Sequence, residues 1–339
     1  MKTFKAVFSS KTTTFWFSHP LLSLTEKLPG ERLIVVTDDQ VFAAHQKLFK
    51  KLDIIVVPAG EAYKQQATVD SIVAQLVERK ADRKTVLVGV GGGVVTDMAG
   101  YAASVYMRGI RFGFVPTTIL AMVDAAIGGK NGIDVGVYKN LVGTIRQPDF
   151  LLYDFSLLKT LPYEQWVNGF AEVIKHAAIK DARMFSLLEN TSLSKLKRDR
   201  VTLAALIERN AKIKIGVVQS DEFEAGERRL LNFGHTLGHA IENELGLLHG
   251  HAISIGMVYA AQISAWTTGF KHTLRLVNLL EQYELPTNAN FSMDNALSIA
   301  FMDKKRENNS MNFILLNKIG NACVQKIAWS KLDEKFKQI

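Results

Sequence analysis

The chain contains a single cysteine, Cys323, among its 339 residues. One cysteine excludes an intrachain disulfide framework and fits a reducing compartment, so we expect a cytoplasmic protein. No apolar run reaches the roughly 20 residues that a membrane span needs. Residues 1–10 are too short and too interrupted for a signal peptide, and we expect no association with a membrane.

The chain also lacks a concentrated tract of one charge, although its formal net charge is +8. The densest basic cluster, residues 195–200, is typical of a solvated helix or loop face. This pattern favours anionic small molecules over nucleic acid as partners. A hydrophobic fraction of 47% is ordinary for a globular protein, and 339 residues usually form two domains.

The first half of the chain alternates short apolar runs with helical patterns. Such alternation predicts βαβ units and a mostly parallel sheet, which binds ligands beyond the carboxyl ends of its strands. The predicted strands are 33–38, 53–58, 85–90, 112–118 and 151–154, and the predicted helices are 41–52 and 69–80.

From Tyr163 onward the hydrophobic period becomes helical. We place the domain boundary near residues 160–162, which gives an α/β domain over 1–160 and a mainly helical domain over 161–339. The predicted helices of the second domain are 169–188, 201–218, 234–245, 252–268 and 273–283, followed by a short hairpin over 311–316 and 322–325.

Three consecutive glycines, Gly91 to Gly93, follow the strand predicted at 85–90. Glycines at a strand–helix junction let backbone amides approach a phosphate at the positive end of the helix. The run does not match the G-x-G-x-x-G dinucleotide pattern. It indicates either a phosphate or dinucleotide site, or a tight turn with close helix–sheet packing, and the pattern alone favours neither.

Two histidines, His235 and His239, lie four residues apart and therefore share one face of a predicted helix. His249 follows shortly, and the carboxylate of Glu172 lies upstream. Imidazole and carboxylate together suit zinc or a similar divalent ion. The spacing mimics H-E-x-x-H, but Thr236 occupies the place of the glutamate that a zinc protease needs, so the protease interpretation is weak.

Cations accompany this candidate metal site and a second polar stretch. Residues 123–134 combine Asp124, two glycines and Lys130 in what we predict to be a loop able to hold an anionic or polyhydroxy ligand. A phosphate or carboxylate group would use several cations, whereas a neutral substrate would not. The remaining cations of this group are Lys139, Lys175, Lys214, Arg228, Lys304 and Lys305.

These motifs resemble the sugar phosphate cyclase family, in the right order from about residue 34 to residue 316. The resemblance rests on Gly91-Gly92-Gly93-x-x-x-Asp97, Tyr106-Met107-Arg108-Gly109, Val115-Pro116-Thr117-Thr118, Val123-Asp124-x-x-x-Gly128-Gly129-Lys130, Lys139-Asn140, Ala171-Glu172-Val173-Ile174-Lys175 and Leu231-Asn232-Phe233-Gly234-His235-Thr236-x-Gly238-His239-Ala240. It implies a Rossmann-like NAD-binding domain with a parallel sheet, a mainly α-helical metal-binding domain with zinc or cobalt, and a homodimer.

The resemblance also implies a role for each matching residue. The metal ligands would be Glu172, His235 and His249, and the catalytic residues Asp124, Lys130, Asn140, Lys175 and His239. The substrate would be bound by Arg108, acting across the dimer, and by Lys139, Lys214, Arg228, Asn232 and Lys305. NAD would be bound by Asp38, Glu61, Lys64, Gly92, Gly93, Val94, Asp97, Thr117, Thr118, Lys130, Lys139, Thr160 and Leu161.

Within the family, the motifs are most similar to those of members that act on 3-deoxy-D-arabino-heptulosonate 7-phosphate in the shikimate pathway. The implied reaction is that of a carbon–oxygen lyase: transient oxidation by NAD, loss of phosphate, re-reduction and intramolecular aldol closure. The alternatives are a relative acting on sedoheptulose 7-phosphate, a metal-dependent polyol dehydrogenase, and a non-catalytic metal- or nucleotide-binding module. Departures from the family pattern occur at Gln40, Thr96, Asp134, Gln165 and His251.

Overall fold

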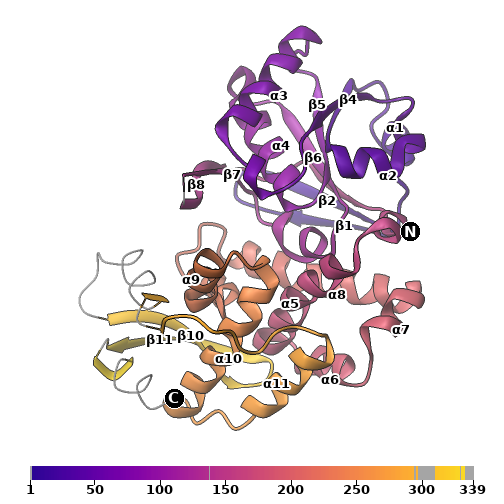
Figure 1. Cartoon of the computed structure of the whole chain (residues 1–339). Coiled ribbons are helices and arrows are strands. Elements are labelled where there is room, and N and C mark those ends of the chain that lie inside the picture. Colours follow the sequence, from indigo (N-terminus) through magenta and orange to yellow (C-terminus); the bar gives the residue numbers. More distant parts are fainter. Residues whose placement is uncertain (1, 137, 294, 297–309, 329, 333–339) are drawn as a thin grey trace. The chain divides into compact units, whose positions relative to one another are not determined.

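The computed structural model describes residues 2–136, 138–293, 295–296, 310–328 and 330–332 (Figure 1). The chain forms two compact units. The first comprises Met1–Trp166 and Arg200–Phe223, and the second comprises Val167–Asp199 and Glu224–Ile339. The sequence-based division at residue 160 differs from this one chiefly at residues 200–223, because a helical period does not tell which of two cores the helix covers.

The first unit is built on a seven-stranded sheet. Its strands are β1 (Lys2–Val7), β2 (Thr12–Phe17), β3 (Leu33–Asp38), β4 (Asp53–Val57), β5 (Val86–Gly91), β6 (Arg111–Pro116) and β9 (Phe150–Tyr153). Their order is β1-β2-β9-β6-β5-β3-β4, and only β1 runs antiparallel to its neighbour. The strands predicted from the first half of the sequence are confirmed, and so is the parallel sheet.

Helices cover both faces of this sheet. Figure 1 shows α1 (Leu24–Lys27) and α2 (Asp39–Phe49) on one side and α3 (Gln66–Glu78) and α4 (Gly93–Val105) on the other. The chain proceeds from β3 outward to β4 and then returns to β5 on the opposite side of β3. This reversal creates a topological switch point beyond the carboxyl ends of β3 and β5, which is where open α/β sheets bind ligands.

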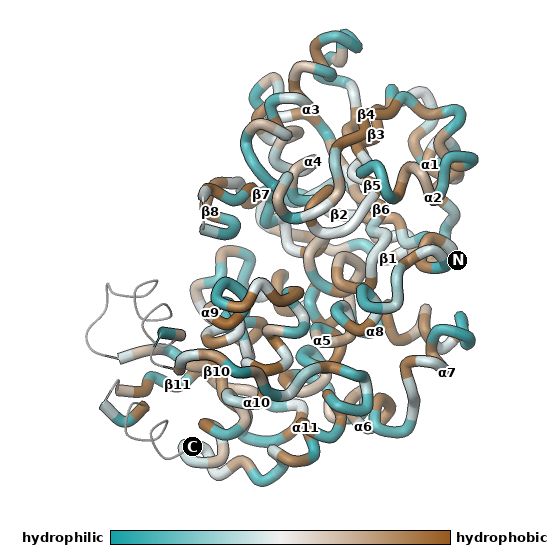
Figure 2. Tube along the Cα trace, viewed as in Figure 1, coloured by the Kyte–Doolittle hydropathy of each residue, from teal (hydrophilic) through white to brown (hydrophobic). Residues whose placement is uncertain are grey.

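The core of the first unit comes from the apolar runs of its central strands, which are visible as hydrophobic segments in Figure 2. Val35, Val88, Val90 and Val115 are buried in it, together with Phe49 from α2. In strands that are buried on both faces, β-branched residues form a continuous run instead of alternating with polar residues. Such runs allowed the positions of these strands to be predicted from the sequence.

Several elements of this unit were not predicted. Besides α1 and the short helical turns, they include the N-terminal strand pair β1–β2, the hairpin of β7 (Lys130–Val135) with β8 (Tyr138–Ile145), and the π-helical turn η4 (Ala121–Ala125). The stretch 123–134, expected to be one loop, is thus a helical turn followed by a strand. The β8 side chains are almost all exposed, so no buried face marks this strand in the sequence.

The second unit is mainly helical. Its elements are α5 (Tyr163–Lys180), α6 (Ala182–Glu189), α7 (Leu193–Arg198), η6 (Glu227–Asn232), α9 (His235–Leu245), α10 (His249–Thr267), α11 (Thr273–Gln282), and the hairpin of β10 (Ser310–Lys318) with β11 (Asn321–Ala328). The first residues of α5 belong to the first unit, which ends this segment at Trp166. The predicted hairpin is confirmed. The single helix predicted over 169–188 is two helices, because the Asp181 side chain accepts a hydrogen bond from the Met184 amide at 2.9 Å and starts a new one.

Helix α8 (Arg200–Ser220) belongs to the first unit, where it packs against η4 and β1. Among the described residues, no helix combines the length and the apolar character that crossing a membrane requires.

Candidate active site

Three side chains of the second unit converge in the geometry of a metal site. Glu172 lies on α5, while His235 and His249 are the first residues of α9 and α10. The Nε2 atoms of the two histidines lie 3.8 and 3.7 Å from Glu172 Oε1. Tetrahedral zinc with ligands at about 2.0–2.2 Å separates its ligand atoms by about 3.3–3.6 Å, so the observed distances are close to those around one ion.

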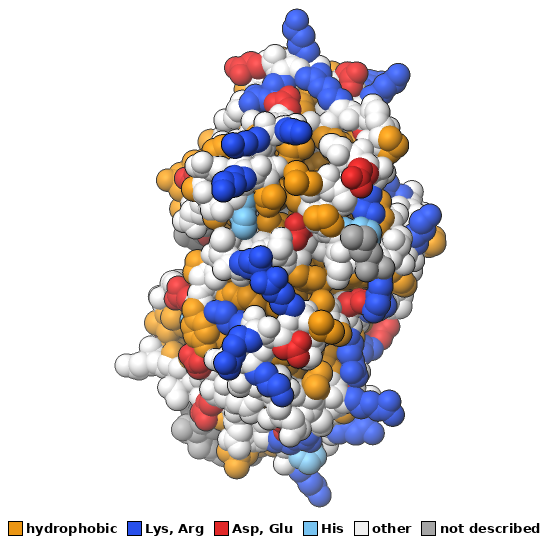
Figure 3. Space-filling view, turned by 90° about the vertical axis from the view of Figure 1, so that its right-hand side faces the viewer, with side chains coloured by type: hydrophobic (Ala, Val, Ile, Leu, Met, Phe, Trp, Pro, Cys, Tyr) orange, Lys and Arg blue, Asp and Glu red, His pale blue; other side chains and the backbone are white. Residues whose placement is uncertain are grey.

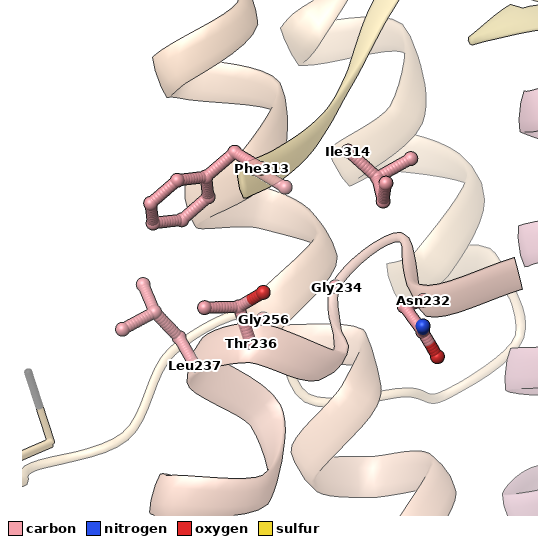
Figure 4. A pocket seen from close by; sticks show the side chains of 8 residues that line it. Asn232, Gly234, Thr236, Leu237, Gly256, Phe313 and Ile314 are labelled. Carbon is pink, nitrogen blue, oxygen red and sulfur yellow. The ribbon is translucent and has the colours of Figure 1, made fainter. Parts of the chain in front are cut away.

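Close packing of α9 against α10 sets this geometry. Gly234 precedes α9 with a φ of 81°, and a Cβ there would lie 2.6 Å from Met257 Cγ. A Cβ on Gly256 would overlap the carbonyl oxygen of Gly234. Figure 4 shows this turn from close by, with Leu237, Phe313 and Ile314 around it. Gly234 and Gly256 therefore mark backbone crowding beside the candidate metal ligands.

The start of α10 is also fixed to α5. The Gly250 amide donates to Asn168 Oδ1 at 2.6 Å, and a Cβ on Gly250 would overlap the Asn168 carbonyl oxygen. Only glycine fits there, so His249 begins its helix at a fixed place relative to Glu172.

The three candidate ligands, Glu172, His235 and His249, have different charged neighbours. Glu172 is fully buried, and its Oε2 contacts the Lys175 ammonium, which is equally buried. Burial, followed by the charge of Lys175, holds the pKa of His235 well below its usual value. Burial also lowers the pKa of His249, but its interactions with Glu172 and Glu242 outweigh burial and raise the pKa to about 9. His235 is thus held as a neutral imidazole, whereas a metal ion would have to displace a proton from His249.

His239, predicted to serve the substrate, is exposed on α9, and its ring centroid lies 5.1 Å from that of His235. A second group of three potential ligands consists of His239, Glu242 and His249. Glu242 was not singled out from the sequence, because its partner His249 lies on another helix. His251 belongs to neither of these groups within the described part of the second unit.

Arg228 and Asn232, both predicted to bind substrate, lie on η6. Arg228 is buried, and Asn232 Nδ2 donates to Glu224 Oε1 at 2.6 Å. Glu224 was missed at the sequence level. Its backbone φ of 61° is unusual for a non-glycine residue, and this fixed turn brings its carboxylate to Asn232.

In the first unit, the glycine run forms a cradle at the start of α4. Gly92 caps the helix without a side-chain hydrogen bond, so the first amides of α4 face outward from the turn. A Cβ on Gly92 would lie 3.2 Å from Thr118 Cγ2, and one on Gly93 would lie 3.0 Å from Ala125 Cβ. The cradle lies at the end of β5, at the switch point, and fits the pyrophosphate of a dinucleotide.

Lys64, Asp97 and Asn140 form one polar network, in which Lys64 is buried, Asp97 is half-buried and Asn140 is exposed. Lys64 Nζ lies 2.7 Å from Asp97 Oδ2 and donates to Asn140 Oδ1 at 2.5 Å. Burial lowers the pKa of Lys64, but the attraction of Asp97 and Glu61 outweighs it, and the net pKa is raised. Burial raises the pKa of Asp97, and Lys64 offsets only part of this shift.

Asn140 is held in place from a second side. Its backbone has a φ of 52°, and its amide donates to Asp134 Oδ1 at 2.6 Å. The Asp134 amide in turn donates to the Lys64 carbonyl oxygen at 2.8 Å. Asp134, a departure from the family pattern, therefore ties the β7–β8 hairpin to Lys64.

Asp124 on η4 pairs with Lys214 on α8, whose Nζ donates to Asp124 Oδ1 at 2.6 Å and to the Asp124 carbonyl at 2.8 Å. Lys130 and Lys139 are exposed on the β7–β8 hairpin, and Arg108 is exposed on η3 (Tyr106–Arg108) with a φ of 63°. These residues all belong to the first unit.

The other predicted NAD contacts also fall in the first unit. Asp38 ends β3 and caps α2 by accepting the Val41 amide at 2.8 Å. The Thr117 amide donates to the Gly91 carbonyl, and Thr160 Oγ1 lies 2.7 Å from His45 Nε2. Glu61 lies on η2 (Glu61–Tyr63), Val94 on α4, and Leu161 directly after η5 (Phe155–Thr160). The predicted residue Lys305 lies outside the described residues.

Comparison of the sequence with protein families gives two matches in tandem. Residues 54–168 match the family model described as 3-dehydroquinate synthase N-terminal, and residues 169–306 match 3-dehydroquinate synthase C-terminal. The chain is 44% identical to the 3-dehydroquinate synthase of Campylobacter curvus over 80% of this chain and 79% of that one. It is 40% identical to that of Coxiella burnetii over 89% of this chain and 88% of that one.

The solved structures that resemble the fold include other cyclases. A 2-deoxy-scyllo-inosose synthase complexed with carbaglucose-6-phosphate, NAD+ and Co2+ superposes with a TM-score of 0.87 at 26% identity, covering 99% of this chain and 100% of that one. The 2-epi-5-epi-valiolone synthase of Streptomyces hygroscopicus gives 0.88 at 24%, covering 98% of each chain. An iron-containing alcohol dehydrogenase gives only 0.60 at 16%, covering 87% of this chain and 91% of that one, and shares the fold alone.

Proposed function

This chain belongs to the 3-dehydroquinate synthase family, and from that premise we propose that it converts 3-deoxy-D-arabino-heptulosonate 7-phosphate to 3-dehydroquinate and inorganic phosphate. The observation that carries the proposal is the cluster of Glu172, His235 and His249, with the Lys175 ammonium on the same carboxylate. A divalent ion held there would sit beside a fixed cation, which suits a substrate that carries both hydroxyl groups and negative charge. As an elimination of phosphate, the reaction is that of a carbon–oxygen lyase.

Two bound groups complete the chemistry. NAD would supply a reversible hydride acceptor, and a zinc or cobalt ion would supply a Lewis acid for vicinal oxygens. The glycine cradle at α4 would hold the NAD pyrophosphate, and Asp38 at the end of β3 would reach its ribose. Glu172, His235 and His249 would hold the ion.

The chain's own side chains would bind and orient the substrate. Lys175, Lys214 and Arg228 are buried cations that can bind phosphate or carboxylate oxygens without first losing much water. Lys130 and Lys139 would add charge from the β7–β8 hairpin. The exposed imidazole of His239 has a donor and an acceptor nitrogen with which to contact the substrate.

A homodimer is also part of the proposal. The β7–β8 hairpin exposes apolar side chains, including Tyr138 at 64%, Leu141 at 62% and Ile145 at 47%, and Met107 on η3 is 43% exposed. A run of this kind on one hairpin is typical of a protein–protein interface. Arg108, adjacent to Met107, would then reach the substrate of the partner subunit.

We infer that the enzyme acts in the cytoplasm on small molecules and not on nucleic acid. On the face drawn in Figure 3, Lys and Arg side chains are interspersed with acidic and hydrophobic ones. A nucleic-acid interface would instead gather basic side chains along one path.

The test is release of inorganic phosphate from purified protein supplied with NAD, a divalent metal and one of three sugar phosphates. We expect release from 3-deoxy-D-arabino-heptulosonate 7-phosphate without net formation of NADH, because the cofactor is regenerated in each turnover. Release from sedoheptulose 7-phosphate or glucose 6-phosphate instead would assign a different cyclase activity. NADH accumulating in step with product would assign a polyol dehydrogenase.

A further inference from the structure

We propose that Glu242 is a positioning residue for the metal centre, which fixes the ring of His249 so that its Nε2 faces the ion. The inference rests on the metal site of the proposed function, but not on which sugar phosphate is turned over. Neither the motif spacing nor the comparisons assign a role to Glu242.

The geometry gives the two nitrogens of His249 different partners. Nδ1 lies 3.2 Å from Glu242 Oε2, whereas Nε2 lies 3.7 Å from Glu172 Oε1. The Glu242 side chain is only 5% exposed, and it comes from α9, one helix before His249 on α10. The two helices pack at Gly234 and Gly256 without room for a Cβ, so the carboxylate and the ring keep their relative position.

This arrangement favours one tautomer of the neutral His249 ring. A carboxylate accepts hydrogen bonds, so Glu242 favours the His249 form with its proton on Nδ1. The lone pair then lies on Nε2, on the side of Glu172 and His235. Imidazole ligands of metals commonly have their second nitrogen bound to a carboxylate, and loss of that partner typically weakens metal affinity 10–100-fold.

The same residues also permit an opposing arrangement. His239, Glu242 and His249 could together surround an ion, with Nδ1 of His249 as a ligand. Glu242 would then be a metal ligand itself, and His249 would carry its proton on Nε2. The site of Glu172, His235 and His249 is favoured, because Glu172 is fully buried and His235 is only partly exposed. The alternative site includes the exposed His239 and would be open to water.

Three variants distinguish the two arrangements. For each variant, the affinity for zinc is measured by competition with a chromophoric chelator. Glu242→Ala removes the acceptor, whereas Glu242→Gln keeps an oxygen that can accept from Nδ1. Glu244→Ala is the matched control, because Glu244 is an exposed acid on the same helix that accepts the Ser292 amide. Thermal unfolding in EDTA verifies that each variant is folded.

We expect zinc to bind 10–100-fold more weakly to Glu242→Ala, and within about threefold of the native affinity to Glu242→Gln and Glu244→Ala. Native affinity in Glu242→Ala would overturn the proposal. Equal loss in Glu242→Gln and Glu242→Ala would also overturn it, because Glu242 would then be a ligand.

A measurement on the native zinc-loaded protein covers the case in which Glu242→Ala does not fold. Nitrogen-15 NMR of the histidine side chains distinguishes a protonated nitrogen from a metal-bound one. We expect His249 to carry its proton on Nδ1 and the metal on Nε2. The reverse assignment would sink the proposal without reference to turnover.

Discussion

Lys130 and Lys214 show how two predicted site lysines differ once their surroundings are known. Lys214 is buried and donates to Asp124 through its ammonium group, so it contributes to the packing of α8 as well as to any substrate contact. Lys130 is exposed at the start of β7. A role in binding or catalysis can therefore be separated from folding at Lys130 and not at Lys214.

We predict that Lys130→Ala lowers turnover by at least 100-fold and changes the free energy of unfolding by less than about 0.5 kcal/mol. The side chain is exposed, so its removal leaves no cavity in the core. Phosphate release and urea unfolding measure the two effects. A variant that unfolds more readily but retains its turnover would remove Lys130 from the active site.

Two buried tyrosines provide a matched stability test. Tyr153 is fully buried on β9, stacked on Phe17, and its hydroxyl has no hydrogen-bond partner among the described residues. Tyr283 is equally buried, but its hydroxyl donates to the Thr191 carbonyl at 2.7 Å. Burying a hydroxyl without a partner costs about 1–3 kcal/mol.

Tyr153→Phe should therefore raise the free energy of unfolding by about 1 kcal/mol, whereas Tyr283→Phe should lower it by about the same amount. Urea denaturation curves give both values. A loss of stability in Tyr153→Phe would show that the hydroxyl has a partner after all.

At the scale of single residues, the sequence indicated the three side chains that the structure brings together as a candidate metal site, because their motifs are local and specific. It did not indicate Glu242 or Glu224. The interaction of Glu242 with His249 joins two helices, and that of Glu224 with Asn232 depends on a turn with positive φ. Such partners are defined by tertiary packing, which residue spacing along the chain does not encode.

At the scale of secondary-structure elements, the candidate metal site depends most on the packing of α9 against α10, because these helices carry His235 and His249. We predict that Gly256→Ala lowers the free energy of unfolding by more than about 3 kcal/mol and weakens zinc binding, because the new methyl group would force the two helices apart. Circular dichroism melting and zinc titration would record both changes.

Gly216→Ala is the control for this prediction. Gly216 is exposed in the C-terminal part of α8, and a Cβ there would meet nothing within 4 Å. Replacement by alanine should stabilise the protein by about 0.5–1 kcal/mol, since glycine is a poor helix former. Similar effects of both substitutions would contradict the role given to Gly256.

Helices and central strands were predictable from hydrophobic period, because each buries a regular face. The β7–β8 hairpin was not, although it carries Lys130, Lys139 and Asn140. Its exposed β8 shows neither alternation nor a buried run, so the sequence gives no signal of a strand. If this hairpin forms a dimer interface, its exposed apolar side chains would be buried against the partner subunit, and a single chain does not show this burial.

At the scale of the whole molecule, we predict that Leu141→Asp converts a dimer to a monomer and reduces phosphate release. An aspartate in the apolar interface would lose water without gaining a partner. Light scattering after size-exclusion chromatography measures the mass in solution. The control is Leu274→Asp, since Leu274 is 71% exposed on α11 and lies outside the hairpin. A native protein that elutes as a monomer would contradict the proposed interface.

The division of the chain into interleaved segments has a consequence for synthesis. The first unit contains Met1–Trp166 and also Arg200–Phe223, so it cannot be completed on the ribosome until residue 223 has left the exit tunnel. By then Val167–Asp199 has already emerged, without the rest of its own unit. The nascent chain must therefore carry α5, and with it Glu172, as an unfinished segment until α9 and α10 are translated. A truncation at residue 166 would therefore leave the first unit without α8.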